Sequence, residues 1–152
     1  DTRIKKLNEG SYDAIILSHA GIKSLNMNNY ISEIFSVEDL IPSAGQGIIS
    51  LQCRDNDKET ISLLKNINHK ETYHRASAER NVLKVLEGDC ETAVGAHASV
   101  NENIITLEAE LFSLDGKKRF YEKKSSDVKD AEKLGLEIGQ ILKLKSNNTY
   151  KK

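Results

Sequence analysis

Apolar and polar positions in the first part of the chain follow the pattern of strands joined to short helices. Residues 13–18, DAIILS, hold four consecutive apolar residues between polar ones, which predicts a strand buried on both faces, as in a parallel sheet. Small residues at 20–21 and a short helix follow, which completes a strand–helix unit. Residues 48–53 predict a second strand, and residues 57–66 predict a helix that Asp57 can cap. This part of the chain therefore indicates an α/β structure.

The second part of the chain begins with the pattern of a long amphipathic helix. Residues 71–87 carry a stripe of four apolar side chains, namely Ala78, Val82, Val85 and Leu86. Asn68 can open this helix, with Glu71 as its capping-box partner, and Gly88 can end it. Residues 75–80, RASAER, are expected to form ordinary helix surface.

Three strands and a last helix are predicted after this helix. The strand candidates are residues 96–100, 104–112 and 118–124, and Asp115–Gly116 between the last two is a hairpin signal. A last helix is predicted from about residue 127 to residue 145, with Gly135 on its apolar side. The residues after it, SNNTYKK, are expected to fray.

The order of these elements predicts two kinds of fold in one chain. The strand–helix part is followed by a helix, three strands and a helix, across a segment that holds Pro42, Gly45 and Gly47. We place the natural break near residues 66–70. The fold class is therefore α/β with an α+β C-terminal domain. The C-terminal part should fold alone, whereas the earlier part should not, because the partners of its sheet are missing.

Composition and charge exclude several classes of protein. The 152 residues carry 22 Lys and Arg against 23 Asp and Glu. This balance lacks the basic excess of a nucleic-acid module or of a polybasic membrane binder. No apolar run approaches the roughly 20 residues of a membrane-spanning helix. Two cysteines are too few for a disulfide scaffold, so a reducing cytosol is expected. The chain begins with Asp and has no leader pattern, so we expect it to be cut from a longer protein.

Cys90 is the candidate residue whose sequence neighbours indicate most about the reactivity of its side chain. Glu87, Asp89 and Glu91 flank it, and it follows the predicted end of a helix, where the partial charge is negative. Both features should raise the pKa of the thiol, which counts against a protease-type nucleophile. A single, slow attachment to a very reactive electrophile is compatible with such a thiol.

The other candidate positions each have a functional and a structural interpretation. Ser18 precedes a helix start, where exposed N–H groups attract anions. Gln46 lies between two glycines and can donate to a ligand or hold a hinge. Arg3 and Lys23 can bind anions or can be solvated surface charges. None of the histidines belongs to a CxxC or HxxxH motif, so no metal site is expected.

Five segments, taken in order, resemble one family. They are TRI, GSYDAIILSHAGIKSL, LIPSAGQGIISLQCRDND, NHKETYHRASAER and LEGDCETAVGAHA, and their order and spacing resemble the second half of porphobilinogen deaminase, also called hydroxymethylbilane synthase. The resemblance implies a transferase of tetrapyrrole biosynthesis that joins four porphobilinogen molecules into hydroxymethylbilane and releases ammonia. It also implies a dipyrromethane cofactor, held by a thioether at Cys90, and a growing polypyrrole chain as ligand.

The resemblance also assigns residues to the cofactor cleft. Arg3 matches an arginine that binds a carboxylate, and Leu17 and Ser18 match a strand end that lines the cleft. Gln46 matches the glutamine of a GQG motif. Lys23 precedes the position where the family usually has an arginine, so it is the candidate substitute for that cation.

The organisation of the family implies the remaining expectations. The family has three α/β domains, of which the first two resemble periplasmic binding proteins. Residues 1–41 would end the second domain, residues 42–69 would form a hinge and return segment of the first, and residues 70–152 would form the cofactor-carrying third. The catalytic aspartate is expected in an N-terminal part outside this chain, so the chain alone should be inactive. The complete enzyme, with that part as partner, is expected to be a cytoplasmic monomer.

Two interpretations from other classes stay open. The chain can be a non-enzymatic anion-binding or interaction module on a binding-protein-like fold. It can also be a thiol hydrolase, which requires a Cys90 thiol that is alkylated rapidly at neutral pH.

Overall fold

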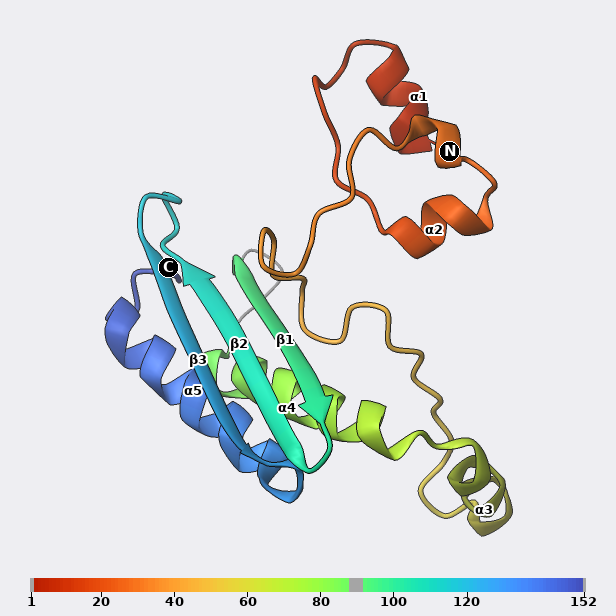
Figure 1. The fold of residues 1–152 in the computed structure, drawn as a ribbon, viewed down its shortest axis with the longest axis vertical. Helices are drawn as coiled ribbons and strands as arrows, with labels where there is room; N and C mark the ends of the chain where they lie inside the picture. Colours follow the sequence, from red (N-terminus) through yellow and green to blue (C-terminus); the bar gives the residue numbers. More distant parts are fainter. Residues whose placement is uncertain (1, 88–91, 152) are drawn as a thin grey trace. The chain divides into compact units, whose positions relative to one another are not determined.

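The computed structural model describes residues 2–87 and 92–151, and the chain divides into two compact units. The first unit ends at Ser36 and the second begins at Val37. The sheet and the long helices all belong to the second unit (Figure 1).

The first unit is helical in its described residues. Its elements are α1 (Thr2–Asn8), α2 (His19–Ser24) and a 3₁₀ turn, η1 (Asn28–Tyr30). The strand predicted over residues 13–18 is wrong, because these residues have no regular secondary structure, and the Ile16 side chain is 67% exposed. A strand forms only where a neighbour satisfies its backbone N–H and C=O groups, and no other strand lies among the described residues of this unit.

The second unit is built around a three-stranded antiparallel sheet with the order β1-β2-β3. The strands are β1 (Val94–Asn101), β2 (Ile104–Phe112) and β3 (Arg119–Asp127). The register places Val94 opposite Leu111 and Glu110 opposite Tyr121. The three predicted strands and the hairpin at Asp115–Gly116 are confirmed, and Gly116 has the positive φ of 69° that favours glycine in such a turn.

Two helices cover one face of this sheet (Figure 1). They are α4 (Lys70–Leu86) and α5 (Ala131–Ser146), and the 3₁₀ turn η2 (Val128–Asp130) precedes α5. The core between helices and sheet consists mainly of Ala78, Val82, Leu86, Ala96, Ala98, Ile105, Leu107, Ala109, Leu111, Leu134, Ile138 and Leu142. We call β1–β3 with α4 and α5 the helix–sheet body. It confirms the predicted α+β fold of the C-terminal part.

A further helix, α3 (Lys58–Ile67), lies earlier in the second unit. The Asp57 carboxylate caps it as predicted, by accepting the N–H of Thr60 at 3.0 Å, and this bond holds the pKa of Asp57 below its usual value. The strand predicted over residues 48–53 is wrong. Ile49 and Leu51 are exposed, Ile49 by 88%, and the segment has no partner strand among the described residues.

The start of α4 differs from the prediction by one residue. Its N-cap is His69, whose Nδ1 accepts the N–H of Thr72 at 3.3 Å. Asn68 is instead the residue that ends α3. Only Asn68 and His69 lie between α3 and α4. Because Asn68 is the C-cap of α3, the ring nitrogen of His69 is the side-chain acceptor for the free N–H groups at the start of α4.

The last residues do not fray, contrary to the prediction. Tyr150 is 1% exposed, and its hydroxyl donates to the Leu86 carbonyl at 2.8 Å. The N–H of Leu114 donates to the Thr149 carbonyl at 2.9 Å. A single aromatic side chain buried against the end of α4 therefore ties the C-terminal segment to the helix–sheet body.

Two glycines bring α5 close to α4. A Cβ on Gly135 would meet the backbone carbonyl group of Ala78, and a Cβ on Gly139 would lie 2.8 Å from the Cβ of Val85. The sequence predicts Gly135 on the apolar side of the last helix, and the structure shows why no side chain fits there.

Candidate functional site

The first unit carries four of the predicted site residues on or beside its two helices. Arg3 lies on α1, and Ser18 is the N-cap of α2, where its hydroxyl accepts the N–H of Gly21 at 3.5 Å. Lys23 lies in the last turn of α2, and the half-buried Leu17 precedes the cap. Arg3, Ser18 and Lys23 are all exposed. Two cations and a hydroxyl group at the surface are suited to bind carboxylates.

The second unit carries Gln46 in a pair of consecutive tight turns. The Gln46 N–H donates to the Ser43 carbonyl at 3.0 Å, and the Ile48 N–H donates to the Gly45 carbonyl at 3.1 Å. Gly45 and Gly47 take the third positions of these turns with φ of 78° and 79°. A positive φ at this position is the pattern of type II turns and requires glycine. Gln46 is exposed at the tip, where its amide can donate to a ligand.

The segment before these turns is attached to β1. Ile41 is buried, and the Pro42 carbonyl accepts the N–H of Ala96 at 2.9 Å. Gly95 makes room for this contact, because a Cβ there would lie 2.7 Å from the Ile41 carbonyl oxygen. The chain that carries Gln46 is thus fixed to the helix–sheet body directly before its turns.

Glu79 adds a second attachment, which the sequence analysis missed. Its carboxylate is buried, with Oε2 accepting the N–H of Gly45 at 2.7 Å and Oε1 accepting the N–H of Ala98 at 2.8 Å. Arg75 donates through Nε to the Ala98 carbonyl at 2.7 Å. The expectation that residues 75–80 are ordinary helix surface is therefore wrong. A usable signal was the position of Glu79, directly after a residue of the apolar stripe.

Cys90 and Gly88 lie outside the described residues, but the end of α4 that precedes them is well defined. Glu87 ends the helix in the left-handed conformation, with φ of 52°. Lys143 Nζ lies 3.2 Å from Glu87 Oε2, and Lys151 Nζ lies 3.6 Å from the same atom. The hydrogen bond from Lys143 is the main cause that lowers the pKa of Glu87. One of the acidic neighbours in the Cys90 argument is therefore charge-paired.

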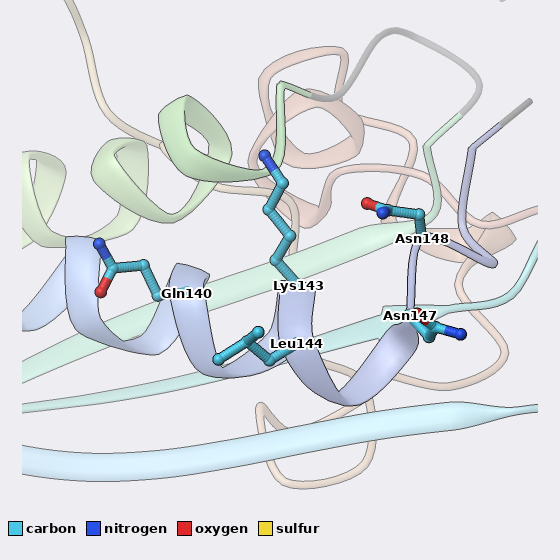
Figure 2. A pocket seen from close by; sticks show the side chains of 5 residues that line it. All are labelled: Gln140, Lys143, Leu144, Asn147 and Asn148. Atoms are coloured by element: carbon cyan, nitrogen blue, oxygen red, sulfur yellow. The ribbon is translucent and has the colours of Figure 1, made fainter.

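Two pockets among the described residues are lined by none of the predicted site residues. One pocket lies at the C-terminal end of α5 and is lined by Gln140, Lys143, Leu144, Asn147 and Asn148 (Figure 2). Figure 2 shows Lys143 extending from α5 toward the end of α4. A second pocket is lined by Gln52, Cys53, Arg54 and Asp57.

The described part of the chain lacks two further features. It contains no cluster of three or more His, Cys, Asp or Glu side chains arranged to hold a metal ion. Within the same residues, no helix has both the length and the apolar character needed to span a membrane.

Comparisons with known proteins point to one family. Residues 1–62 match the family model described as "Porphobilinogen deaminase, dipyromethane cofactor binding domain". Residues 73–143 match the model described as "Porphobilinogen deaminase, C-terminal domain". The two matches lie in this order along the chain and together cover most of it.

Individual relatives agree with both family models. A protein of Desulforamulus reducens named porphobilinogen deaminase is 40% identical over 142 residues, which are 93% of this chain and 46% of the relative. Proteins of the same name from Brevibacillus brevis and Nostoc sp. are 41% and 36% identical, over 93% and 94% of this chain and 46% and 44% of their own lengths. The chain thus spans about half the length of the curated relatives that it matches. It belongs to the porphobilinogen deaminase family.

Proposed function

We propose that this chain is the C-terminal half of an enzyme that joins four porphobilinogen molecules into hydroxymethylbilane and releases ammonia. The observation that carries the proposal is the identity of about 40% to proteins named porphobilinogen deaminase, over 93% of this chain. Because the chain corresponds to less than half of each relative, we expect no turnover by the chain alone. The catalytic aspartate would come from the other half of the enzyme, and the site of action would be the cytoplasm.

The donor groups of the chain fit a dipyrromethane cofactor chemically. Its pyrrole rings carry acetate and propionate groups, which require cations and N–H donors. Arg3 and Lys23 supply cations at the surface of the first unit. Ser18, which follows Leu17 in the sequence, supplies a hydroxyl group. Gln46 supplies an amide at the tip of its turns. When bound, the cofactor supplies the end to which porphobilinogen units are added.

Each of these residues has a distinct task in the proposal. Arg3 and Lys23 neutralise carboxylates, so the acidic polypyrrole stays bound while it lengthens. The Ser18 hydroxyl and the Gln46 amide orient polar groups, and Leu17 offers an apolar contact to a ring. Cys90 holds the cofactor through its sulfur as a thioether. Lys23 is a compact cation next to Ser24, the position where the family usually has an arginine, so its carboxylate contact lacks the two-pronged geometry of guanidinium.

The proposal is tested in a chimera, because the chain represents only part of the enzyme. The corresponding half of the Desulforamulus reducens relative is replaced by this chain, and the chimera is produced in a bacterial host that makes porphobilinogen. Intact-mass spectrometry should show a dipyrromethane adduct, and the purified protein should consume porphobilinogen. The Cys90→Ala variant should lose both signals.

Cys53→Ala is the matched control, since it removes the other thiol of the chain and should keep adduct and activity. Comparison of the thermal unfolding of the chimera with that of the parent relative shows whether the chimera folds. An unmodified Cys90 thiol in a folded chimera would contradict the proposal and favour a non-enzymatic anion-binding module. Rapid alkylation of that thiol at neutral pH would favour a thiol hydrolase instead.

A further inference from the structure

The Glu79 carboxylate joins three parts of the second unit that are distant in sequence. It projects from the middle of α4 and is 3% exposed. One oxygen accepts the N–H of Gly45 at 2.7 Å, and the other accepts the N–H of Ala98 on β1 at 2.8 Å. Helix, sheet edge and the turns that carry Gln46 therefore meet at one side chain.

A buried carboxylate holds the backbone N–H groups that donate to it firmly in place. Burial of a carboxylate is costly unless its oxygens accept hydrogen bonds, and bonds to an ionised acceptor are about twice as strong as neutral ones. Both oxygens of Glu79 are used, and both donors are backbone N–H groups with fixed positions. Gly45 is itself part of the turns, so its N–H cannot keep this contact if the turns move away from α4.

Neighbouring contacts hold the two ends of this connection. Arg75, one turn earlier on α4, donates to the Ala98 carbonyl at 2.7 Å and so fixes the strand side. The Pro42 carbonyl accepts the Ala96 N–H, and Ile41 packs where Gly95 has no side chain, which fixes the chain before the turns. Between Pro42 and Gln46, the half-buried Ala44 packs against the core, and Glu79 adds the hydrogen bond that holds the backbone of the turns.

We propose that Glu79 is a positioning residue, which holds the Gly45–Gln46–Gly47 turns against the helix–sheet body and so sets where Gln46 is presented. The attachment itself rests only on the contacts above. Its consequence for ligand binding rests on the proposed function, because that function gives Gln46 its role. The two parts therefore need separate measurements.

The attachment is tested in the complete 152-residue chain, without cofactor. Backbone amide exchange is followed by NMR in the parent chain, in Glu79→Gln and in Glu71→Gln. The glutamine keeps one acceptor oxygen, so either Gly45 or Ala98 then faces an amide NH₂ group, which cannot accept. Glu71 lies exposed on the same helix and is the matched control.

The informative quantity is the exchange rate of Gly45 relative to that of Leu107, which lies in the centre of the core. A loss of overall stability accelerates the Leu107 amide at least as much as the Gly45 amide, because core amides exchange through global unfolding. Loss of the attachment accelerates Gly45 selectively, and we expect a relative increase of about tenfold for Glu79→Gln and none for Glu71→Gln. Equal acceleration of Gly45 and Leu107, or no acceleration, overturns the proposal.

Gly95→Ala tests the attachment if Glu79→Gln fails to fold. The added Cβ displaces Ile41 and Pro42 from β1 but leaves Glu79 in place. The bond from Gly45 to Glu79 then remains, so the Gly45 amide should stay protected relative to that of Leu107. An unprotected Gly45 amide in Gly95→Ala would overturn the proposal, since it would show that Glu79 cannot hold the turns.

The consequence for binding is measured in the chimera described above. If Glu79 acts through Gln46, then Glu79→Gln raises the KM for porphobilinogen more than it lowers kcat, and the double variant with Gln46→Ala is no worse than Gln46→Ala alone. Additive effects overturn the link between the two residues. A Gln46→Ala variant with normal kinetics removes the assigned role of Gln46, but the exchange result for Gly45 still stands.

Discussion

Replacement of Gly135 by alanine tests the close contact between α4 and α5. An added Cβ would meet the backbone carbonyl group of Ala78 and would lie 2.9 Å from the Cβ of Asn81. Carbon atoms in ordinary contact are about 3.5–4.0 Å apart, so the helices must separate by about 1 Å. The obstacle includes backbone atoms, which cannot rotate away as a side chain can.

Two opposing effects set the magnitude. Alanine is a better helix former than glycine by about 1 kcal/mol, which stabilises α5. Overpacking of a core usually costs about 1–3 kcal/mol, and a clash with backbone belongs at the upper end or above. A 1 Å gap also weakens contacts along the whole interface, which includes Leu134, Ile138 and Val82. We therefore expect Gly135→Ala to destabilise the chain by about 2 kcal/mol.

Urea unfolding, followed by far-ultraviolet circular dichroism, measures this effect. With a slope of about 1–2 kcal/mol/M for a domain of this size, the midpoint should fall by about 1–2 M. Gln140→Ala changes an exposed position of the same helix and should leave the midpoint nearly unchanged. A midpoint for Gly135→Ala equal to or above that of the parent would refute the reasoning, because helix propensity would then outweigh the contact.

Three further predictions concern polar contacts. Tyr150→Phe removes the bond from the hydroxyl to the Leu86 carbonyl and should lower the free energy of unfolding by about 1 kcal/mol, measured by urea unfolding; an unchanged value would contradict a role for this bond. Lys143 lowers the pKa of Glu87, so this pair stabilises the folded chain above the ordinary pKa of a glutamate, and the contribution is lost as the pH falls through the lower folded value. Lys143→Gln should return the pKa of Glu87 toward its ordinary value in an NMR titration, and no change would show that the pair does not form in solution. Asp57→Ala should destabilise α3 through loss of its N-cap, seen as faster amide exchange in α3 alone, and unchanged exchange there would contradict the role of this cap.

The helix–sheet body could be predicted because its elements depend on local patterns. The apolar stripe over residues 71–87 has a helical period, and the pattern of residues 96–124 places a hairpin signal between two strands. The burial of Ala78, Val82 and Leu86 agrees with that stripe. Each of these segments finds its packing partner within the next few dozen residues.

The strands predicted over residues 13–18 and 48–53 failed because a strand depends on partners that periodicity does not reveal. An apolar run shows that a segment would be stable if buried, but Ile16 and Ile49 remain exposed, and no strand in the described part of the chain covers them. Glu79 was missed for a related reason. A search for apolar stripes treats a carboxylate as surface and does not detect backbone N–H groups that approach it from Gly45 and Ala98.

The predicted binding residues could be selected from the sequence, but their arrangement could not. Ser18 as a helix cap and Gln46 between two left-handed glycines follow from local rules, and the structure shows both local geometries. Whether Arg3, Lys23 and Gln46 bind one ligand depends on how distant segments come together. That property is fixed by tertiary packing and stays a prediction until binding is measured.

The attachments along β1 also affect how this protein meets other copies of itself. Ala96 and Ala98 point their outward N–H groups at Pro42 and Glu79, so a strand from a second molecule finds these donors already occupied. The opposite edge strand, β3, carries several charged side chains, among them Lys123 and Lys124, and charged side chains on an edge strand disfavour pairing with another strand. Proteolytic loss of residues 37–45 would free the Ala96 N–H and uncover part of the β1 edge, which would favour aggregation through intermolecular sheet formation even if the helix–sheet body stayed folded.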